Sequence, residues 1–327
     1  MTHMSAWERV NAALAGQPVD YPPVSIWRHF PEHDQTAAQL TDATLAWQAR
    51  HPGDFVKLMP PGDYGTIDWG ATSVFRGNTH GTRETTRFPV ATSMDWARLR
   101  PVAVDRGMLR EVVEAARLVN EQLGGATPVL QTIFSPLTTA MKLSNGQVIQ
   151  HLRDEPDAVH AGLRVIAGVT SELTRVTLER GAGGIFFATQ CATADLLTAA
   201  EYQAFGARYD LQVLAAATAS RFTLLHIHGQ QPLFAELQSY PAHGFNWHDR
   251  RTAPNLAEGQ RISGRCVVGG LDEEAIATMR PEDAAAQAQS AVAALAGRHV
   301  MIAPGCVIPT ATPAAAIDAV LQAVRTN

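Results

Sequence analysis

The chain has 327 residues, of which 46% are hydrophobic and 17% are charged, and its formal net charge is −5. This size and apolar content allow one large α/β domain or two medium ones, and they exclude wholesale disorder. No block rich in Lys and Arg occurs, which disfavours a nucleic acid or an anionic membrane surface as a partner.

The N-terminal segment has no apolar signal core, and no apolar run reaches the ~18 residues that a transmembrane helix needs. We therefore expect a cytoplasmic protein. The three cysteines, Cys191, Cys266 and Cys306, are too few and of odd number for a disulfide framework. Their thiols are expected to be reduced, and either buried or available to a metal.

After a predicted N-terminal helix over Ser5–Ala15, eight short runs rich in β-forming residues follow along the chain. They cover Pro23–Trp27, Asp54–Met59, Pro128–Phe134, Gly184–Ala188, Phe222–His228, Gly244–Trp247, Cys266–Leu271 and Val300–Ala303. Helical segments separate most of them, for example Asp105–Leu123, Pro156–Arg180, Ala199–Ala217, Pro281–Ala296 and Pro313–Val324. Apolar strands alternating with helices are typical of parallel strands covered by helices.

Eight such units predict an α/β fold, a (β/α)8 TIM barrel, in a single domain over residues 1–327. An open doubly wound sheet has the same local pattern and is the alternative. Between the second and third strands, Tyr64–Val90 is rich in Gly, Thr and Arg and has no helical period. Within it, Thr66–Trp69, Ser73–Arg76 and Thr85–Phe88 are predicted as short antiparallel strands, a β-hairpin insertion after strand 2 at the barrel mouth.

The strongest chemical signal is a pair of histidines at the end of the fifth run. His226 and His228 are two residues apart, so on a strand both imidazoles point to the same side. Cys306 follows the eighth run, and the carboxyl ends of barrel strands meet around one mouth. Two imidazoles and a thiolate are good zinc ligands, and three protein ligands leave one position open, as in catalytic zinc sites. The alternative is a core histidine and a thiol that only fills space.

Two further residues are candidates for substrate binding. Arg28, directly after the first run, could hold a carboxylate or phosphate, or it could form a surface ion pair. Asp249, after the sixth run, could orient a ligating histidine or pair with Arg250 or Arg251. His248 is an additional donor in that run, but as a lone histidine we expect it to be structural.

Seven segments along nearly the whole chain resemble the uroporphyrinogen decarboxylase superfamily. They are Trp7–Leu14, Pro23–Arg28, Phe134–Ala140, Gly184–Gln190, Leu225–Gly229, Val268–Asp272 and Pro304–Pro309. The resemblance implies a (β/α)8 barrel. The chain matches the site residues of the true decarboxylases poorly. Arg28 corresponds to their first arginine, but Glu32 stands in place of the second arginine and Pro61 in place of an aspartate. Likewise, Lys142 replaces a tyrosine and Gly305 replaces a histidine.

The zinc methyltransferase branch of this superfamily resembles the chain more closely at its site. That branch, which moves methyl groups between corrinoid proteins and thiols such as coenzyme M, has a His-x-Cys motif and a distant Gly-Cys. His226 and Cys306 match the histidine and the distant cysteine, and His228 takes the place of the first cysteine. The resemblance thus implies zinc held by two histidines and one cysteine. Such a zinc is a stronger Lewis acid and makes a bound thiolate less nucleophilic.

The leading hypothesis is a zinc-dependent methyl (or small alkyl) transferase. A small-molecule thiol would bind zinc at His226, His228 and Cys306 and accept a methyl group from a corrinoid, with a corrinoid protein as the candidate partner. One alternative is a metal-free carboxy-lyase acting on an acidic tetrapyrrole, with Arg28, Arg76, Arg83 and Arg87 as the anion clamp. Another is a corrinoid- or tetrapyrrole-binding module without catalysis.

Overall fold

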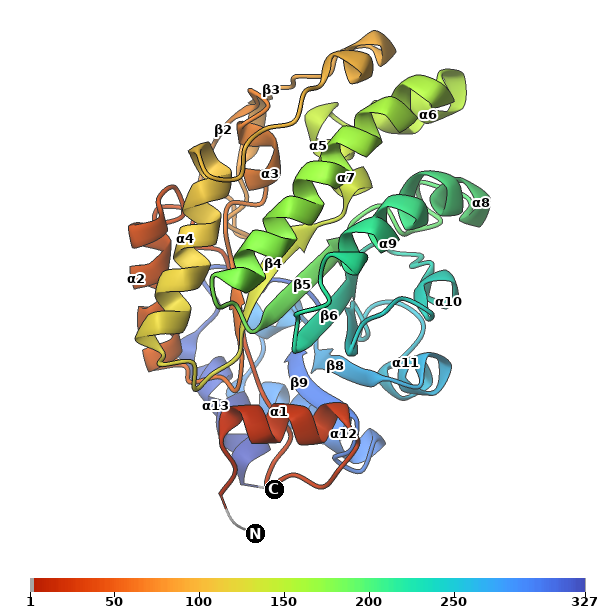
Figure 1. Ribbon diagram of the computed structural model, residues 1–327. Coiled ribbons are helices and arrows are strands. Elements are labelled where there is room, and N and C mark those ends of the chain that lie inside the picture. Colours follow the sequence, from red (N-terminus) through yellow and green to blue (C-terminus); the bar gives the residue numbers. More distant parts are fainter. Residues whose placement is uncertain (1–2, 327) are drawn as a thin grey trace.

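The computed structural model describes residues 3–326 and consists of a curled parallel sheet surrounded by helices (Figure 1). The sheet has seven strands in the order β1-β4-β5-β6-β7-β8-β9, all pairs being parallel. The strands are β1 Val56–Leu58, β4 Val129–Phe134, β5 Gly184–Thr189, β6 Phe222–Ile227, β7 Gly244–Trp247, β8 Cys266–Leu271 and β9 Val300–Pro304. Each lies within or close to one of the predicted runs.

The first predicted run, Pro23–Trp27, closes the cylinder between β9 and β1 without forming a full strand. Ile302 donates to the carbonyl of Pro23 (2.7 Å) and accepts from the amide of Ser25 (3.0 Å). On the other side, the Val24 carbonyl accepts from the amide of Asp54 (2.8 Å). Pro23 has no N–H to give, which limits the ladder to an isolated bridge. The barrel prediction is confirmed, and the open doubly wound sheet is not what forms.

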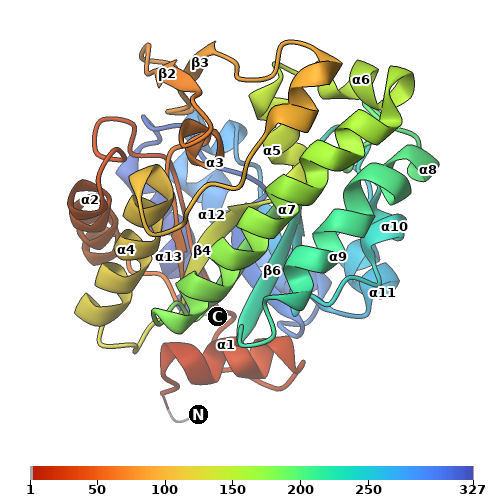
Figure 2. The ribbon, with the colours of Figure 1, turned by 45° about the horizontal axis from the view of Figure 1, so that its top comes forward.

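Helices cover the outside of the sheet. Helix α1 (Ala6–Leu14) lies across the end of the barrel opposite the hairpin of β2 (Thr72–Val74) and β3 (Glu84–Arg87) (Figures 1 and 2). A capping box between Ser5 and Glu8 begins α1, as expected from the predicted Ser5–Ala15 helix. The longer helices are α1 Ala6–Leu14, α2 Ala37–Arg50, α4 Gly107–Gln122, α5 Pro136–Leu143, α6 Val148–Asp154, α7 Pro156–Glu179, α9 Arg208–Ala215, α11 Leu256–Ser263, α12 Pro281–Ala294 and α13 Ala314–Arg325. Single-turn or irregular helices are α3 Tyr64–Ile67, α8 Ala199–Tyr202, α10 Phe234–Leu237, η1 Ser93–Arg98, η2 Gln203–Ala207 and η3 Ala275–Ala277.

The insertion after β1 contains a two-stranded antiparallel hairpin, β2 Thr72–Val74 and β3 Glu84–Arg87, as predicted. The prediction of a further strand over Thr66–Trp69 is wrong, because the first two residues of that segment belong to helix α3. The buried Tyr64 side chain anchors this turn to the barrel by donating to the carbonyl of Thr132 (2.8 Å). This tertiary contact outweighs the weak local preference of the segment for β-structure.

Strand alternation decides which side chains point into the barrel. On β6, Phe222 and Leu224 belong to the core cluster inside the barrel, whereas Leu225 and Ile227 pack against the helices. His226 is next in the inward series, so it lies above two apolar layers at the carboxyl end of the strand.

Among residues 3–326, no helix is both long and apolar enough to cross a bilayer.

Candidate metal centre

A cavity of about 340 Å³ lies at the carboxyl ends of the strands, where barrel enzymes carry their sites. Its lower wall is formed by inward-pointing strand residues, among them Thr132, Phe186 and His226. Its mouth is covered in part by the insertion, since His80 and Thr82 also line it. Thr310 holds this loop in place by donating its backbone N–H to the carbonyl of Thr79 (2.7 Å). The insertion thus lies at the barrel mouth, as predicted.

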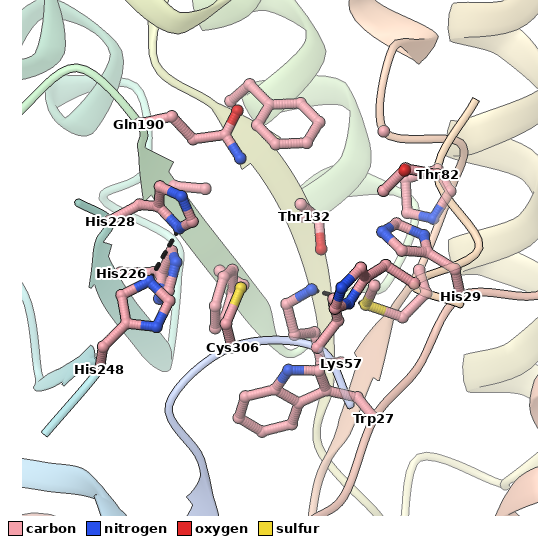
Figure 3. A pocket seen from close by; sticks show the side chains of 18 of the residues that line it. Trp27, His29, Lys57, Thr82, Thr132, Gln190, His226, His228, His248 and Cys306 are labelled. Carbon is pink, nitrogen blue, oxygen red and sulfur yellow. Dashed lines mark hydrogen bonds between the residues drawn. The ribbon is translucent and has the colours of Figure 1, made fainter. Parts of the chain in front are cut away.

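Four possible metal ligands converge on one side of this cavity. One ligand atom each from His226, His228, His248 and Cys306 lies within 4.8 Å of the others. His226 is the penultimate residue of β6, His228 follows that strand, His248 follows β7 and Cys306 follows β9. In Figure 3 the three imidazoles gather on one side, and the Cys306 sulfur lies between them and Lys57. The structure brings the three predicted ligands together and adds His248, which we expected to be structural.

The orientation of His226 follows from the hydrogen bonds of Asn246. Asn246 Nδ2 donates to the carbonyls of Val268 (2.7 Å) and Pro304 (3.1 Å), so its Oδ1 is left to accept from His226 Nδ1 (2.6 Å). His226 Nδ1 therefore carries the proton, and the Nε2 lone pair is free for a cation. Burial, reinforced by the neighbouring His228 and His248, holds the pKa of His226 well below its usual value. The imidazole is thus neutral, as a metal ligand must be.

His248 and His228 form a second oriented unit. His248 Nδ1 donates to the buried carboxylate of Glu273 (2.5 Å), a carboxylate–histidine pair of the kind that supports metal ligands. The Nε2 of His248 then lies 2.9 Å from His228 Nδ1. A bound cation could replace the proton between these nitrogens and take both lone pairs. Burial lowers the pKa of His228 to about 4, so it too is neutral at neutral pH.

Cys306 reaches the cluster through a close approach of its loop to β7. A Cβ at Gly305 would come within 2.7 Å of Glu273 Oε2 and 2.8 Å of the Trp247 carbonyl, so only glycine fits there. Burial raises the pKa of the Cys306 thiol to about 11, although the nearby Lys57 acts in the opposite direction. A cation in the cluster would be needed to make it a thiolate near neutral pH.

The donor set fits zinc. Zinc prefers imidazole nitrogen and thiolate sulfur at ~2.0–2.3 Å, which places tetrahedral ligand atoms ~3.3–3.8 Å apart. A mutual separation within 4.8 Å is close to that requirement. His226 and His248 each have a hydrogen-bond partner on Nδ1, and such support is characteristic of metal-ligating histidines.

Arg28 and Asp249 are placed apart from this cluster, and neither lines the cavity. Arg28 donates to the carbonyl of Thr310 and its guanidinium lies 4.8 Å from the Trp47 ring. The Asp249 carboxylate accepts from the amide of Gly270 (3.0 Å), and burial raises its pKa to about 7. Their substrate-binding roles stay a prediction without geometric support, and Glu273 is the carboxylate that orients a histidine of the cluster.

The cavity also contains Lys57 and Lys142, which the sequence reasoning did not identify as site residues. Lys57 stands within the otherwise apolar run Phe55–Met59, and a charge inside a buried strand was the signal that could have identified it. Burial lowers the pKa of Lys57 to about 7 and that of Lys142 to about 8.

Replacing Asn246 by leucine is expected to weaken zinc binding ~10–100-fold, because His226 loses the partner that orients it. The carbonyls of Val268 and Pro304 lose their donor as well, which should destabilise the metal-free protein by ~1–3 kcal/mol. Chelator competition and urea denaturation would measure the two effects, with the exposed Asn11→Leu as control. Unchanged zinc affinity in Asn246→Leu would contradict the proposed role of His226.

Comparison of the sequence with known proteins identifies a family and relatives that match most of the chain. The sequence profile of the family described as Uroporphyrinogen decarboxylase (URO-D) matches residues 78–327. Over 99% of its length, the chain is 21% identical to Methylcobamide:CoM methyltransferase MtbA of Methanosarcina acetivorans and 25% identical to Methylcobamide:CoM methyltransferase MtaA of Methanosarcina barkeri, covering 99% and 98% of those proteins.

Solved structures agree with the barrel assignment. A methyltransferase from Methanosarcina mazei superposes with a TM-score of 0.87 at 20% identity, covering 99% of both chains. A B12-independent methionine synthase from Shewanella sp. W3-18-1 superposes with a TM-score of 0.58 at 13% identity, covering 94% of this chain and 95% of that one. At these identities the likeness concerns the fold alone.

Proposed function

This chain belongs to the uroporphyrinogen decarboxylase family, and from that premise we propose that it is a zinc-dependent methyl (or small alkyl) transferase that activates a thiol. The observation that carries the proposal is the convergence of His226, His228, His248 and Cys306 in one cavity. Relatives named as methylcobamide:CoM methyltransferases, similar over almost their full length, support methyl transfer as the reaction class.

In this proposal, His226, His228 and Cys306 hold the metal, and the fourth position, which His248 can also reach, is where the substrate thiol would bind. Zinc bound there would lower the pKa of a coordinated substrate thiol, so that a thiolate is present near neutral pH. Asn246 and Glu273 keep the lone pairs of His226 and His248 directed at the cavity. The apolar rings of Trp27, Phe134 and Phe186 line the space beside the donors and limit the access of water.

We further propose that the methyl donor is a corrinoid carried by a partner protein, by analogy with the named relatives. The cavity of about 340 Å³ lies at the low end of ligand pockets, which suits a small thiol. The donor would approach at the mouth, beside the loop that contains His80 and Thr82.

Decarboxylation of an acidic tetrapyrrole has less support. Of the described residues that line the cavity, none is an arginine. Arg76 pairs with Glu84 on the exposed hairpin, and Arg83 contacts Asp34 and the Pro31 carbonyl. The arginine clamp that this alternative requires is therefore not assembled around the cavity.

The proposal is tested with the purified protein. We expect about one zinc per chain by elemental analysis and zinc-dependent methylation of a small thiol with methylcobalamin as donor, lost on chelation and restored by zinc. Less than stoichiometric zinc after zinc loading, or thiol methylation that is unaffected by chelation, would overturn it. Release of CO2 from uroporphyrinogen without metal would favour the decarboxylase instead.

A further inference from the structure

The cavity contains every lysine of the chain. Lys and Arg together number 26, and only two of them, Lys57 and Lys142, are lysines. Both line the cavity that holds the metal donors, and arginine supplies the positive charge elsewhere. An arginine side chain stays protonated, whereas a buried lysine readily loses a proton and becomes a nucleophile. The two lysines are therefore the candidates for a reactive amine in this protein.

Lys57 lies inside the barrel among groups that stabilise a positive charge poorly. It is on β1, lines the cavity and is 7% exposed. Its Nζ is 2.6 Å from the sulfur of Met59, 4.3 Å from the centre of the Phe186 ring and 5.8 Å from that of the Trp27 ring. A thioether is a weak acceptor, and a ring face attracts an ammonium less than a carboxylate does. Among the ion pairs formed by residues 3–326, none includes Lys57.

The titratable groups around Lys57 add no negative charge near neutral pH. Three groups from other segments interact with it electrostatically, namely His29, His226 and Cys306. Burial lowers the pKa of His29 to about 3 and holds that of His226 well below its usual value, so both imidazoles are neutral. Burial also raises the pKa of the Cys306 thiol to about 11. In Figure 3 the Lys57 amine lies between Cys306 and His29.

Lys142, on α5, keeps its proton more firmly than Lys57 does. Its Nζ donates to the carbonyl of Gly62 and lies 3.7 Å from the centre of the Phe134 ring. Asp63 attracts it electrostatically. Burial lowers the pKa of Lys142 to about 8 and that of Lys57 to about 7, so at pH 7 about half of the Lys57 side chains are free amines.

The space beside Lys57 suits a small carbonyl compound. The cavity has a volume of about 340 Å³, and Trp27 and Phe186 give it apolar walls next to the amine. It reaches the surface at His80 and Glu274, whose side chains are 38% and 42% exposed. We propose that Lys57 is a nucleophilic amine that binds small uncharged aldehydes covalently, as an imine. This site goes beyond the proposed function and does not depend on the metal.

The reaction needs no reactant besides the aldehyde. The lone pair of Lys57 Nζ attacks the carbonyl carbon, a C–N bond forms, and one amine hydrogen passes to the carbonyl oxygen to give a carbinolamine. The C–O bond then breaks, and the oxygen leaves as water with the second amine hydrogen. A C=N bond remains. Apolar walls that exclude bulk water protect this imine from hydrolysis.

Reductive trapping of the imine would test the site in the metal-free protein. The protein would be incubated at about pH 7.5 with propionaldehyde and cyanoborohydride, which reduces an imine to a stable propylamine, and peptide mass mapping would locate the propyl group. We expect Lys57 to be labelled ~10–100-fold faster in the folded protein than in guanidinium-unfolded protein, because unfolding restores the ordinary lysine pKa of about 10.4.

Two variants that keep the positive charge provide the controls. Lys57→Arg cannot form an imine and should lose the fast label, whereas Lys142→Arg should retain fast labelling of Lys57. Thermal unfolding would establish that both variants fold, and the comparison of folded with unfolded wild type needs neither. Absence of label on Lys57, or labelling at equal rates in folded and unfolded wild type, would overturn the site. Such a result would leave the proposed methyl transfer untouched, because no metal, thiol or methyl donor takes part.

Discussion

Replacement of Cys306 by serine is expected to lower zinc affinity by more than ~100-fold and to abolish thiol methylation at ordinary zinc concentrations. Removal of a partner that merely supports a ligand already weakens binding ~10–100-fold, so loss of the only thiolate should weaken it more. A serine hydroxyl is similar in size to the thiol, but its oxygen is a harder and weaker ligand for zinc than a thiolate sulfur. Chelator competition would measure the affinity, and elemental analysis the metal content.

The chain offers a matched control for this experiment. Cys266 is likewise a free thiol, but it is buried, begins β8 and lies in the apolar core at the opposite end of the barrel from the donors. Cys266→Ala should retain zinc and activity, with at most a modest loss of stability. If Cys306→Ser keeps one tightly held zinc per chain, the metal centre is not where we place it.

Zinc affinity is expected to increase with pH, by ~10-fold for each unit between about pH 7 and 8.5. Burial raises the pKa of Cys306 to about 11, so in this range the metal-free thiol is protonated and zinc must displace its proton. Each unit of lower pH therefore weakens binding tenfold. His226 and His228 do not add to this slope, because burial lowers their pKa values, to about 4 for His228, and both are already neutral.

Chelator competition at several pH values, with the pH dependence of the chelator accounted for, would give this slope. The Cys306→Ser variant provides the internal comparison, since it has no thiol proton for zinc to displace. Its zinc affinity, although weak, should be nearly independent of pH. A flat profile for wild type would mean that Cys306 does not ligate as a thiolate.

Most of the barrel could be predicted because it depends on local patterns. Continuous apolar runs alternating with helical segments define parallel strands covered by helices, and seven of the eight runs contain regular strands of the sheet. The exception, Pro23–Trp27, occupies its expected place but lacks a ladder, since Pro23 has no N–H. Thr66–Trp69 was mispredicted because the anchoring of Tyr64 to Thr132 is a contact between distant segments.

The metal donors could be predicted only in part. His226 lies on β6 and His228 directly follows that strand, so their common side follows from the period of two of extended backbone. His248 looked structural because a lone histidine carries no pattern that reveals its neighbours. Only the folded chain brings it to 2.9 Å from His228, backed by Glu273. Arg28 was plausible by position, yet its guanidinium turns towards the Thr310 carbonyl and Trp47.

The sequence by itself therefore determined the fold class, the inward direction of His226 and His228, and the presence of a thiol after the last strand, because periodicity and strand order are local properties. The tertiary structure decided which side chains meet: that His248 completes the donor cluster, that Asn246 and Glu273 orient it, and that both lysines face the same cavity. These contacts join segments far apart in the chain, and their geometry depends on how the whole barrel closes.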